Sequence, residues 1–275
     1  MDLQDAAVFF DTTSVYDAYT GAFLWKCQYS SFNDANVVGS TSTRRILSIG
    51  PGLSLPARRA VRILESVWLV GDGNTDAWDE DDIRQSFNMK KAMTSTRYGP
   101  PGLAAQGLLT QVSYTQREFF REQIDLLNST NSSTIWNSYC APAESVVSGT
   151  ILYDGSLYLR VYMVHLPLEG LLVSECQELS GLVTATFEGS TYNPLTDTLT
   201  GSPVAVPALW VPSTRLYREA DATSPKPGPG DITLLVPSSQ VTPKVGGKVT
   251  LPAGKFRIVA CLAELDAWLV QVRDA

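Results

Sequence analysis

The chain has 275 residues, of which 44% are hydrophobic and 18% charged, with a net charge of −7. This length is enough for one large β domain or two ordinary domains, each with its own hydrophobic core. The acidic balance argues against a protein that clamps nucleic acid, because such proteins need a basic surface to displace counterions from phosphates. No apolar run is long enough to cross a bilayer and the first residues lack basic side chains, so we expect a protein made in the cytosol.

The first half of the chain predicts short strands separated by turns. Apolar and β-branched residues indicate strands at Phe23 to Gln28, Arg45 to Ile49 and Val61 to Val70. An Asp/Gly/Asn-rich turn follows the third of these, and Ile83 to Ala92 is expected to return beside it. The Pro/Gly-rich segment Tyr98 to Gly107 is expected to be a loop.

One amphipathic helix is predicted, over residues 113–127. Ser113 and Gln116 have the spacing of a capping box. Four apolar residues then follow a helical stripe: Phe119, Phe120, Ile124 and Leu127. A polar stretch at 128–138 ends this part, which we interpret as an N-terminal β module over 1–140.

The second half, 141–275, is predicted to be a C-terminal β module. The turn signal Asp154-Gly155 indicates a hairpin between Val146 to Leu152 and Leu157 to His165. Further strands are expected at Leu171 to Leu179 and Leu182 to Glu188.

Residues 189–230 contain seven prolines, which favour extended loops or an arm over the interior of a sheet. After this predicted arm, four apolar runs separated by Pro and Gly turns predict an antiparallel meander: Ile232 to Val236, Lys248 to Leu251, Phe256 to Leu262 and Trp268 to Val272. The fold class expected is mainly β, with antiparallel barrel or sandwich modules, one helix and long Pro-rich loops.

A short internal similarity joins the two halves. Arg62-Ile63-Leu64 precedes Trp68-Leu69-Val70 much as Arg257-Ile258-Val259 precedes Trp268-Leu269-Val270. Two related β modules would produce this pattern, and so would chance in a β-rich sequence.

No constellation of residues predicts catalysis, a metal or a cofactor. The only histidine, His165, ends a predicted strand, and no serine lies in a nucleophile elbow. The four cysteines lie far apart, without a CxxC pair: Cys27, Cys140, Cys176 and Cys261. Asp72-x-Asn74-x-Asp76 begins like a calcium loop but has Ala77 where glycine is required. A pair of carboxylates suited to glycoside hydrolysis stays open, since sequence gives no distances.

The sequence has one concentration of basic residues. Its arginines are Arg44, Arg45, Arg58, Arg59 and Arg62. Scattered surface salt pairs, a phosphate contact and a subunit interface are all compatible with it. We expect contacts with a neighbouring subunit or a portal protein at three of these arginines and at residues of two Pro-rich segments. These residues are Arg58, Arg59, Arg62, Tyr98, Pro100, Pro101, Pro225 and Pro227.

The C-terminal meander resembles the neck proteins of tailed bacteriophages, in particular head-closure (stopper) and head–tail adaptor proteins. The resemblance lies in Asp231 to Gly246, Lys255 to Val259 and Trp268 to Arg273, and a second similarity runs from Arg58 to Asp76. It covers about a third of the chain. The Pro-rich segment and the predicted helix depart from a minimal stopper.

The resemblance implies a structural virion protein, not an enzyme, assembled in the host cytoplasm. Such proteins form homo-oligomeric rings, bind portal or adaptor proteins on one side and tail proteins on the other, and let DNA pass without binding it specifically. No cofactor and no membrane contact are implied. A tail hub, nozzle or tail-tube component is the alternative within this class, and a β-rich carbohydrate-active enzyme or carbohydrate-binding module is the alternative outside it.

Overall fold

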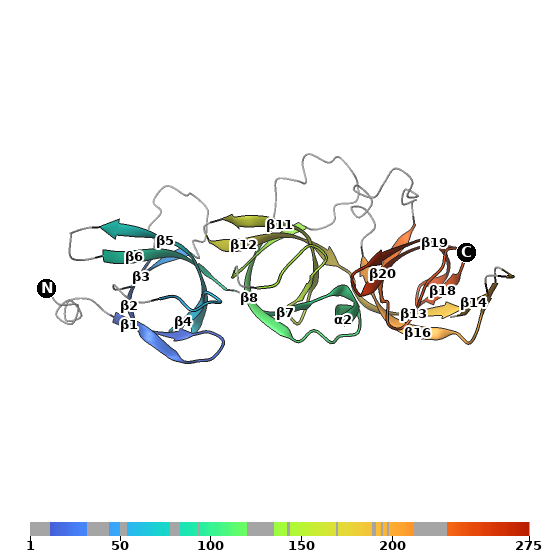
Figure 1. The fold of residues 1–275 in the computed structure, drawn as a ribbon, viewed down its shortest axis with the longest axis horizontal. Helices are drawn as coiled ribbons and strands as arrows, with labels where there is room; N and C mark the ends of the chain where they lie inside the picture. Colours follow the sequence, from blue (N-terminus) through green and yellow to red (C-terminus); the bar gives the residue numbers. More distant parts are fainter. Residues whose placement is uncertain are drawn as a thin grey trace.

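The computed structural model of the chain describes residues 12–31, 44–49, 54–77, 83–92, 94–119, 135–141, 144–168, 170–188, 191–193, 195–196, 198–211 and 230–274. These residues form three closed β-barrels and a separate two-stranded sheet, so the prediction of a mainly β fold with antiparallel barrels is confirmed. The barrels lie in a row, with the first and the third at opposite ends (Figure 1).

Each barrel has six antiparallel strands. The first comprises β1 (Thr12–Asp17), β2 (Phe23–Ser31), β3 (Arg44–Ile49), β4 (Ala60–Ile63), β5 (Ser66–Ala77) and β6 (Ile83–Lys91). The second comprises β7 (Thr94–Gly99), β8 (Gln111–Phe119), β9 (Ile135–Cys140), β10 (Ile151–Tyr153), β11 (Tyr158–Leu168) and β12 (Leu171–Leu179). The third comprises β13 (Gly181–Glu188), β16 (Val204–Val211), β17 (Ile232–Pro237), β18 (Lys248–Leu251), β19 (Gly254–Glu264) and β20 (Ala267–Asp274).

The strand order is the same in all three barrels. When the strands of each barrel are numbered from 1 to 6 along the chain, the order around the barrel is 1-2-3-6-5-4 every time. The third barrel carries the small hairpin β14 (Thr191–Asn193) and β15 (Thr198–Thr200) between its first two strands. The short internal similarity seen in the sequence does not follow this repeat, because it compares strands 4 and 5 of the first barrel with strands 5 and 6 of the third.

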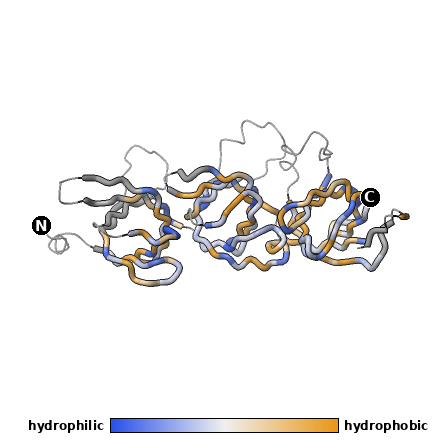
Figure 2. Tube along the Cα trace, in the orientation of Figure 1, coloured by the Kyte–Doolittle hydropathy of each residue, from blue (hydrophilic) through white to orange (hydrophobic). Residues whose placement is uncertain are grey.

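Each barrel closes around its own apolar core. Hydrophobic and hydrophilic positions alternate along strands of the second and third barrels (Figure 2). On β19, for example, Phe256 and Ile258 are buried in the third barrel while Arg257 between them is exposed. Burying a side chain of this size stabilises the fold by about 1.5–3 kcal/mol.

The structure divides the chain differently from the two modules expected. Residue 140 ends β9 and therefore lies inside the second barrel, not at a boundary. The connections between barrels are short, running from Lys91 to Thr94 and from Leu179 to Gly181.

The predicted helix over 113–127 is wrong in its described part, since Gln111–Phe119 forms strand β8. Residues 120–134 lie outside the described part. Among the described residues the helix is instead α2 (Pro101–Ala105), within the segment expected to be a loop. Ser113 and Thr115 are buried on β8, and such polar interior positions hide the alternation that marks a strand.

Most of the other predicted strands agree with the structure. Val61 to Val70 is an exception, because it divides into β4 and β5 at Leu64 and Glu65. The Asp/Gly/Asn turn expected after Val70 is also wrong, since β5 continues to Ala77. All four strands of the C-terminal meander are present as β17 to β20. Val146 to Leu152 is a strand only at its end, in β10. The predicted arm over 189–230 contains β14, β15 and β16, and Pro207 lies within β16. There β17 pairs only with Leu209–Val211, so Pro207 has a partner strand on one side, as proline in a strand requires.

Candidate functional site

The first polar cluster joins the first barrel to the second and is centred on Glu144. Glu144 lies between β9 and β10, and its side chain is only 2% exposed. The hydroxyls of Tyr19 and Tyr98 donate hydrogen bonds to its carboxylate at 2.8 and 2.6 Å. The Arg58 guanidinium donates from Nε and Nη2, at 2.9 and 2.7 Å, and stacks 3.5 Å from the centre of the Tyr19 ring. One carboxylate therefore binds three side chains drawn from two barrels.

The electrostatics of this cluster favour a fixed joint. Burial, and then the hydrogen bond to Glu144, raise the pKa of Tyr98 to about 12. Burial raises the pKa of Tyr19 further still. Both phenols are therefore protonated donors at neutral pH, and neither is poised to give up its proton in a reaction.

Apolar packing surrounds the Glu144 cluster. Side chains from both barrels form one buried group across the junction: Ala18, Ala60, Leu69, Tyr139, Leu171 and Val173. Backbone contact is close as well, because a side chain at Gly170 would place its Cβ 2.3 Å from Asp72 Oδ1. The first two barrels are thus held by an interface with an apolar centre and a hydrogen-bonded edge.

The second junction, between the second and third barrels, is built on α2. Ala104, Ala105 and Leu109 pack in one cluster with residues of β16, β17 and β20. The backbone N–H groups of Gly102 and Leu103 donate to the Asp266 carboxylate at 2.8 and 3.2 Å.

An ion pair flanks this helix. Arg160 Nη2 lies 2.5 Å from Glu264 Oε1, and the two side chains are only 10% and 17% exposed. Glu264 ends β19 and Asp266 lies in the turn to β20, so one hairpin of the third barrel supplies both carboxylates.

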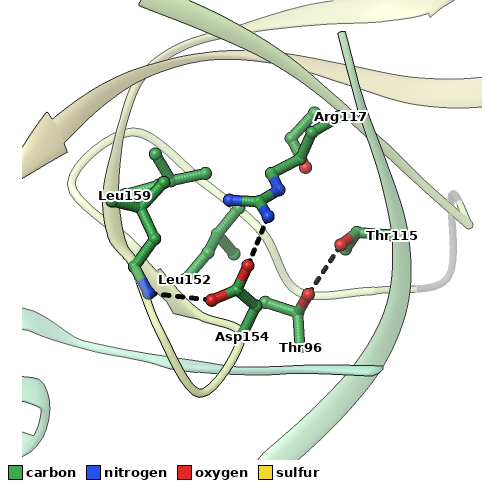
Figure 3. Close-up of a pocket in the computed structure, with 8 residues that line it drawn as sticks. Thr96, Thr115, Arg117, Leu152, Asp154 and Leu159 are labelled. Atoms are coloured by element: carbon green, nitrogen blue, oxygen red, sulfur yellow. Dashed lines mark hydrogen bonds and ion pairs between the residues drawn. The ribbon is translucent and has the colours of Figure 1, made fainter. Parts of the chain in front are cut away.

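The interior of the second barrel holds a third polar group, shown in Figure 3. Arg117 from β8 forms an ion pair with Asp154, and the hydroxyls of Thr96 and Thr115 hydrogen-bond at 2.6 Å. Burial pushes the pKa of Asp154 up, but hydrogen bonds from Ser156 and Leu157 and the charge of Arg117 outweigh it and lower the pKa. The hollow contains about 170 Å³ of empty space in total, and none of it is wide enough for a water molecule. These polar groups stabilise the barrel and leave no room for a ligand.

The remaining reactive residue types are placed for structure. His165 Nε2 lies 2.9 Å from Glu175 Oε1 on the neighbouring strand, with no serine or cysteine in a triad with it among the described residues. Burial raises the pKa of all four thiols, to about 12 for Cys27 and Cys140 and about 11 for Cys261. Within the described ranges, no group of three or more His, Cys, Asp or Glu residues could hold a metal ion.

Two of the residues expected at an interface come together at the first junction. Arg58 and Tyr98 both bind Glu144. Arg62 hydrogen-bonds the Ala18 carbonyl at 3.4 Å, and Arg59 forms an ion pair with the exposed Asp72. Their role between subunits stays a prediction, since these contacts lie within one chain.

The expected prolines divide between the second junction and the undescribed part of the chain. Pro100 and Pro101 precede and begin α2. Pro225 and Pro227 lie outside the described residues. The acidic members of the junctions, Glu144, Glu264 and Asp266, were not predicted, because a single carboxylate in a connection carries no sequence signal of its partner.

No described helix has the length and apolar character needed to span a membrane. Comparison with known proteins gives no match to a family model, to a curated protein or to a solved structure.

Proposed function

We propose that this chain is a structural protein of a tailed-bacteriophage virion, a ring-forming component of the joint between head and tail. The observation that carries the proposal is the pair of built junctions that hold three barrels in line. At both junctions the most buried charged groups bind the neighbouring barrel. A chain organised in this way transmits position and force through contacts between folded units.

The charge of the chain is compatible with a channel for DNA. A net charge of −7 gives no general attraction for phosphates, and DNA moves most freely past a surface that does not hold it. The proposed partners are further copies of the chain, portal or adaptor proteins on one side and tail proteins on the other, in the assembled virion.

The resemblance of the C-terminal meander to stopper and adaptor proteins sets the proposal in the phage neck. The meander is the third barrel from β17 onward, which closes on itself through β13 and β16. In this role the protein acts mechanically and carries out no reaction.

A carbohydrate-active enzyme would need an open cleft with paired carboxylates. The hollow inside the second barrel, lined by eight residues around Arg117 and Asp154, is too narrow for a sugar ring. This hollow is therefore no candidate for a sugar site, and the two built junctions favour assembly as the role of the chain.

Cryo-electron microscopy of phage particles whose genome encodes this chain would test the proposal. We expect density for three barrels in a ring at the head–tail junction, and detection of the chain in purified virions by mass spectrometry. Density at the tail hub or tube would move the protein within the virion. Absence from the particle, together with turnover of a glycan by the purified chain, would overturn the proposal.

A further inference from the structure

The two junctions within the chain share two connections of each barrel, and the first junction adds Arg58 and Glu144 from the connections between strands 3 and 4. The connection between strands 1 and 2 reaches forward to the next barrel, through Ala18 and Tyr19 in the first barrel and through α2 in the second. The hairpin between strands 5 and 6 reaches back to the preceding barrel, through Gly170 and Leu171 in the second barrel and through Glu264 to Asp266 in the third.

This rule leaves one connection of each kind without a neighbouring barrel in the chain. In the first barrel, strands β5 and β6 extend on the side away from the second barrel (Figure 1). In the third barrel, β13 and β16 are joined at the end away from α2, where β20 also ends. Each end of the row therefore has one of these two kinds of connection that meets no other barrel of the same chain.

The far end of the third barrel presents a row of positive charge. Lys248, Arg257 and Arg273 lie directly opposite one another on the adjacent strands β18, β19 and β20, and all three are exposed. Lys255 is exposed two residues before Arg257, on the same face. Like charges in register on neighbouring strands repel one another, so this row destabilises the isolated barrel.

Among the residues that the structure describes, acidic neighbours lie at the edges of the row. Arg273 is bound by Asp231 through two hydrogen bonds, at 2.6 and 2.8 Å, and Lys248 lies opposite Glu188. Arg257, in the middle, has cations on both sides across the sheet. The centre of the row therefore has an excess of positive charge.

Arg257 has a counterpart at the second junction. Arg160 lies near the start of β11, strand 5 of the second barrel, and its neighbours Leu159 and Val161 point into the barrel core. Arg257 lies near the start of β19, strand 5 of the third barrel, between the core residues Phe256 and Ile258. Arg160 binds Glu264 from the backward hairpin of the next barrel, whereas Arg257 is exposed.

The backward connection of the first barrel is strongly acidic in sequence. Residues 79–82, between β5 and β6, read Asp79-Glu80-Asp81-Asp82. We propose that this acidic segment of a second copy binds the basic row Lys248, Lys255, Arg257 and Arg273, so that copies associate head to tail. The contact repeats between chains the Arg160–Glu264 contact found within one.

Head-to-tail contacts of this kind are heterologous and build rings or open filaments. The inference deepens the assembly role proposed above by naming the surface, and rests on that role only for the setting in a virion. Because exposed ion pairs are screened by salt, we expect the association to weaken as ionic strength rises.

Sedimentation velocity of the purified full-length chain, over a range of concentrations at low and high salt, tests the proposal. We expect the wild type to associate at low salt and Arg257→Glu to weaken the association at least about tenfold. Arg97→Glu is the matched control, since it makes the same charge change at an exposed strand position of the middle barrel. This control should associate like the wild type.

A charge exchange separates a specific contact from a general effect of charge. Lys248→Glu/Arg257→Glu and Asp79→Lys/Asp81→Lys should each fail to associate alone at low concentration. An equimolar mixture of the two should associate, because the first variant keeps the wild-type acidic segment 79–82 and the second keeps the wild-type basic row. Circular dichroism melts confirm that each variant is folded.

Three outcomes would overturn the inference: a wild type that is monomeric at all concentrations, equal effects of Arg257→Glu and Arg97→Glu, or no recovery in the mixture. Binding of labelled duplex DNA is measured for the same variants. If Arg257→Glu loses DNA binding while its self-association is unchanged, the proposed contact between copies would also be refuted. Virion incorporation is measured separately, so a purified chain that associates as expected yet is absent from particles would refute only the proposed setting.

Discussion

Glu144 concentrates the polar contacts of the first junction in one side chain. Glu144→Ala removes the acceptor for two buried phenols and for Arg58. Breaking a buried pair costs about 3–5 kcal/mol, and we expect a value toward the lower end, about 3 kcal/mol, because Arg58 is 40% exposed and partly screened. Urea unfolding followed by tryptophan fluorescence measures this change.

Glu175→Ala is the control for that experiment. Glu175 also pairs with a basic residue on a neighbouring strand, His165, but the His165 side chain is 44% exposed. We expect a loss below about 1 kcal/mol there. Equal losses for the two substitutions would show that Glu144 does not join the barrels.

The tyrosines of the same cluster make stability depend on alkaline pH. The pKa of a tyrosine is ordinarily 10.0, whereas the pKa of Tyr98 in the fold is about 12. Between these values the unfolded chain loses the proton while the folded chain keeps it, so the free energy of unfolding falls as pH rises. Its contribution is complete below about pH 10 and is lost toward pH 12. Tyr98→Phe should flatten this decline in pH-dependent unfolding, and an unchanged slope would contradict the assignment.

Single residues were predictable where they act locally and not where they act across the chain. Asp154-Gly155 indicated its turn, because the preference for a tight hairpin is contained in the dipeptide itself. Glu144 binds Arg58 and Tyr19, 86 and 125 residues away. No local pattern encodes such a contact, so only the fold reveals that Arg58 and Tyr98 share an acceptor.

At the scale of elements, α2 makes a close backbone contact with the third barrel. A Cβ at Gly102 would lie 2.4 Å from the Asp266 carbonyl oxygen, so Gly102→Ala must push the β19–β20 hairpin away. We expect a loss of about 1–3 kcal/mol in the free energy of unfolding, as for other overpacked sites. Leu103→Ala, on the same helix but partly exposed, should cost less. Thermal unfolding compares the two, and a milder effect of Gly102→Ala would show that the hairpin is not seated on α2.

Strands were predictable when their interior positions are apolar. β18 and β12 have the bounds that the sequence indicates, and β17, β19 and β20 differ only at their ends. β8 was missed because Ser113 and Thr115 are buried and Arg117 points toward Asp154 inside the barrel (Figure 3). A barrel whose interior contains hydroxyl and charged groups breaks the rule that alternation of polarity identifies a strand.

For the whole molecule, barrel closure explains why two modules were expected and three are present. Closure pairs β1 with β4, β7 with β10 and β13 with β18, contacts between strands that are distant in sequence. The periodicity of single strands contains no information on which strand closes a barrel. A closed barrel also leaves no free edge, so the units meet through their connections and not through sheet extension.

The arrangement of three barrels in a row predicts the size of the molecule in solution. A compact globule of this length would have a radius of gyration of about 19 Å. We expect small-angle X-ray scattering to give a clearly larger value and an elongated distance distribution, because Glu144 and α2 hold the barrels end to end. The measurement belongs at high salt and low concentration, where the contact through Arg257 is weakest. We do not expect the barrels to fold onto one another, because Leu171 and Leu269 are packed in the two junctions. A radius of gyration near 19 Å would contradict the extended arrangement.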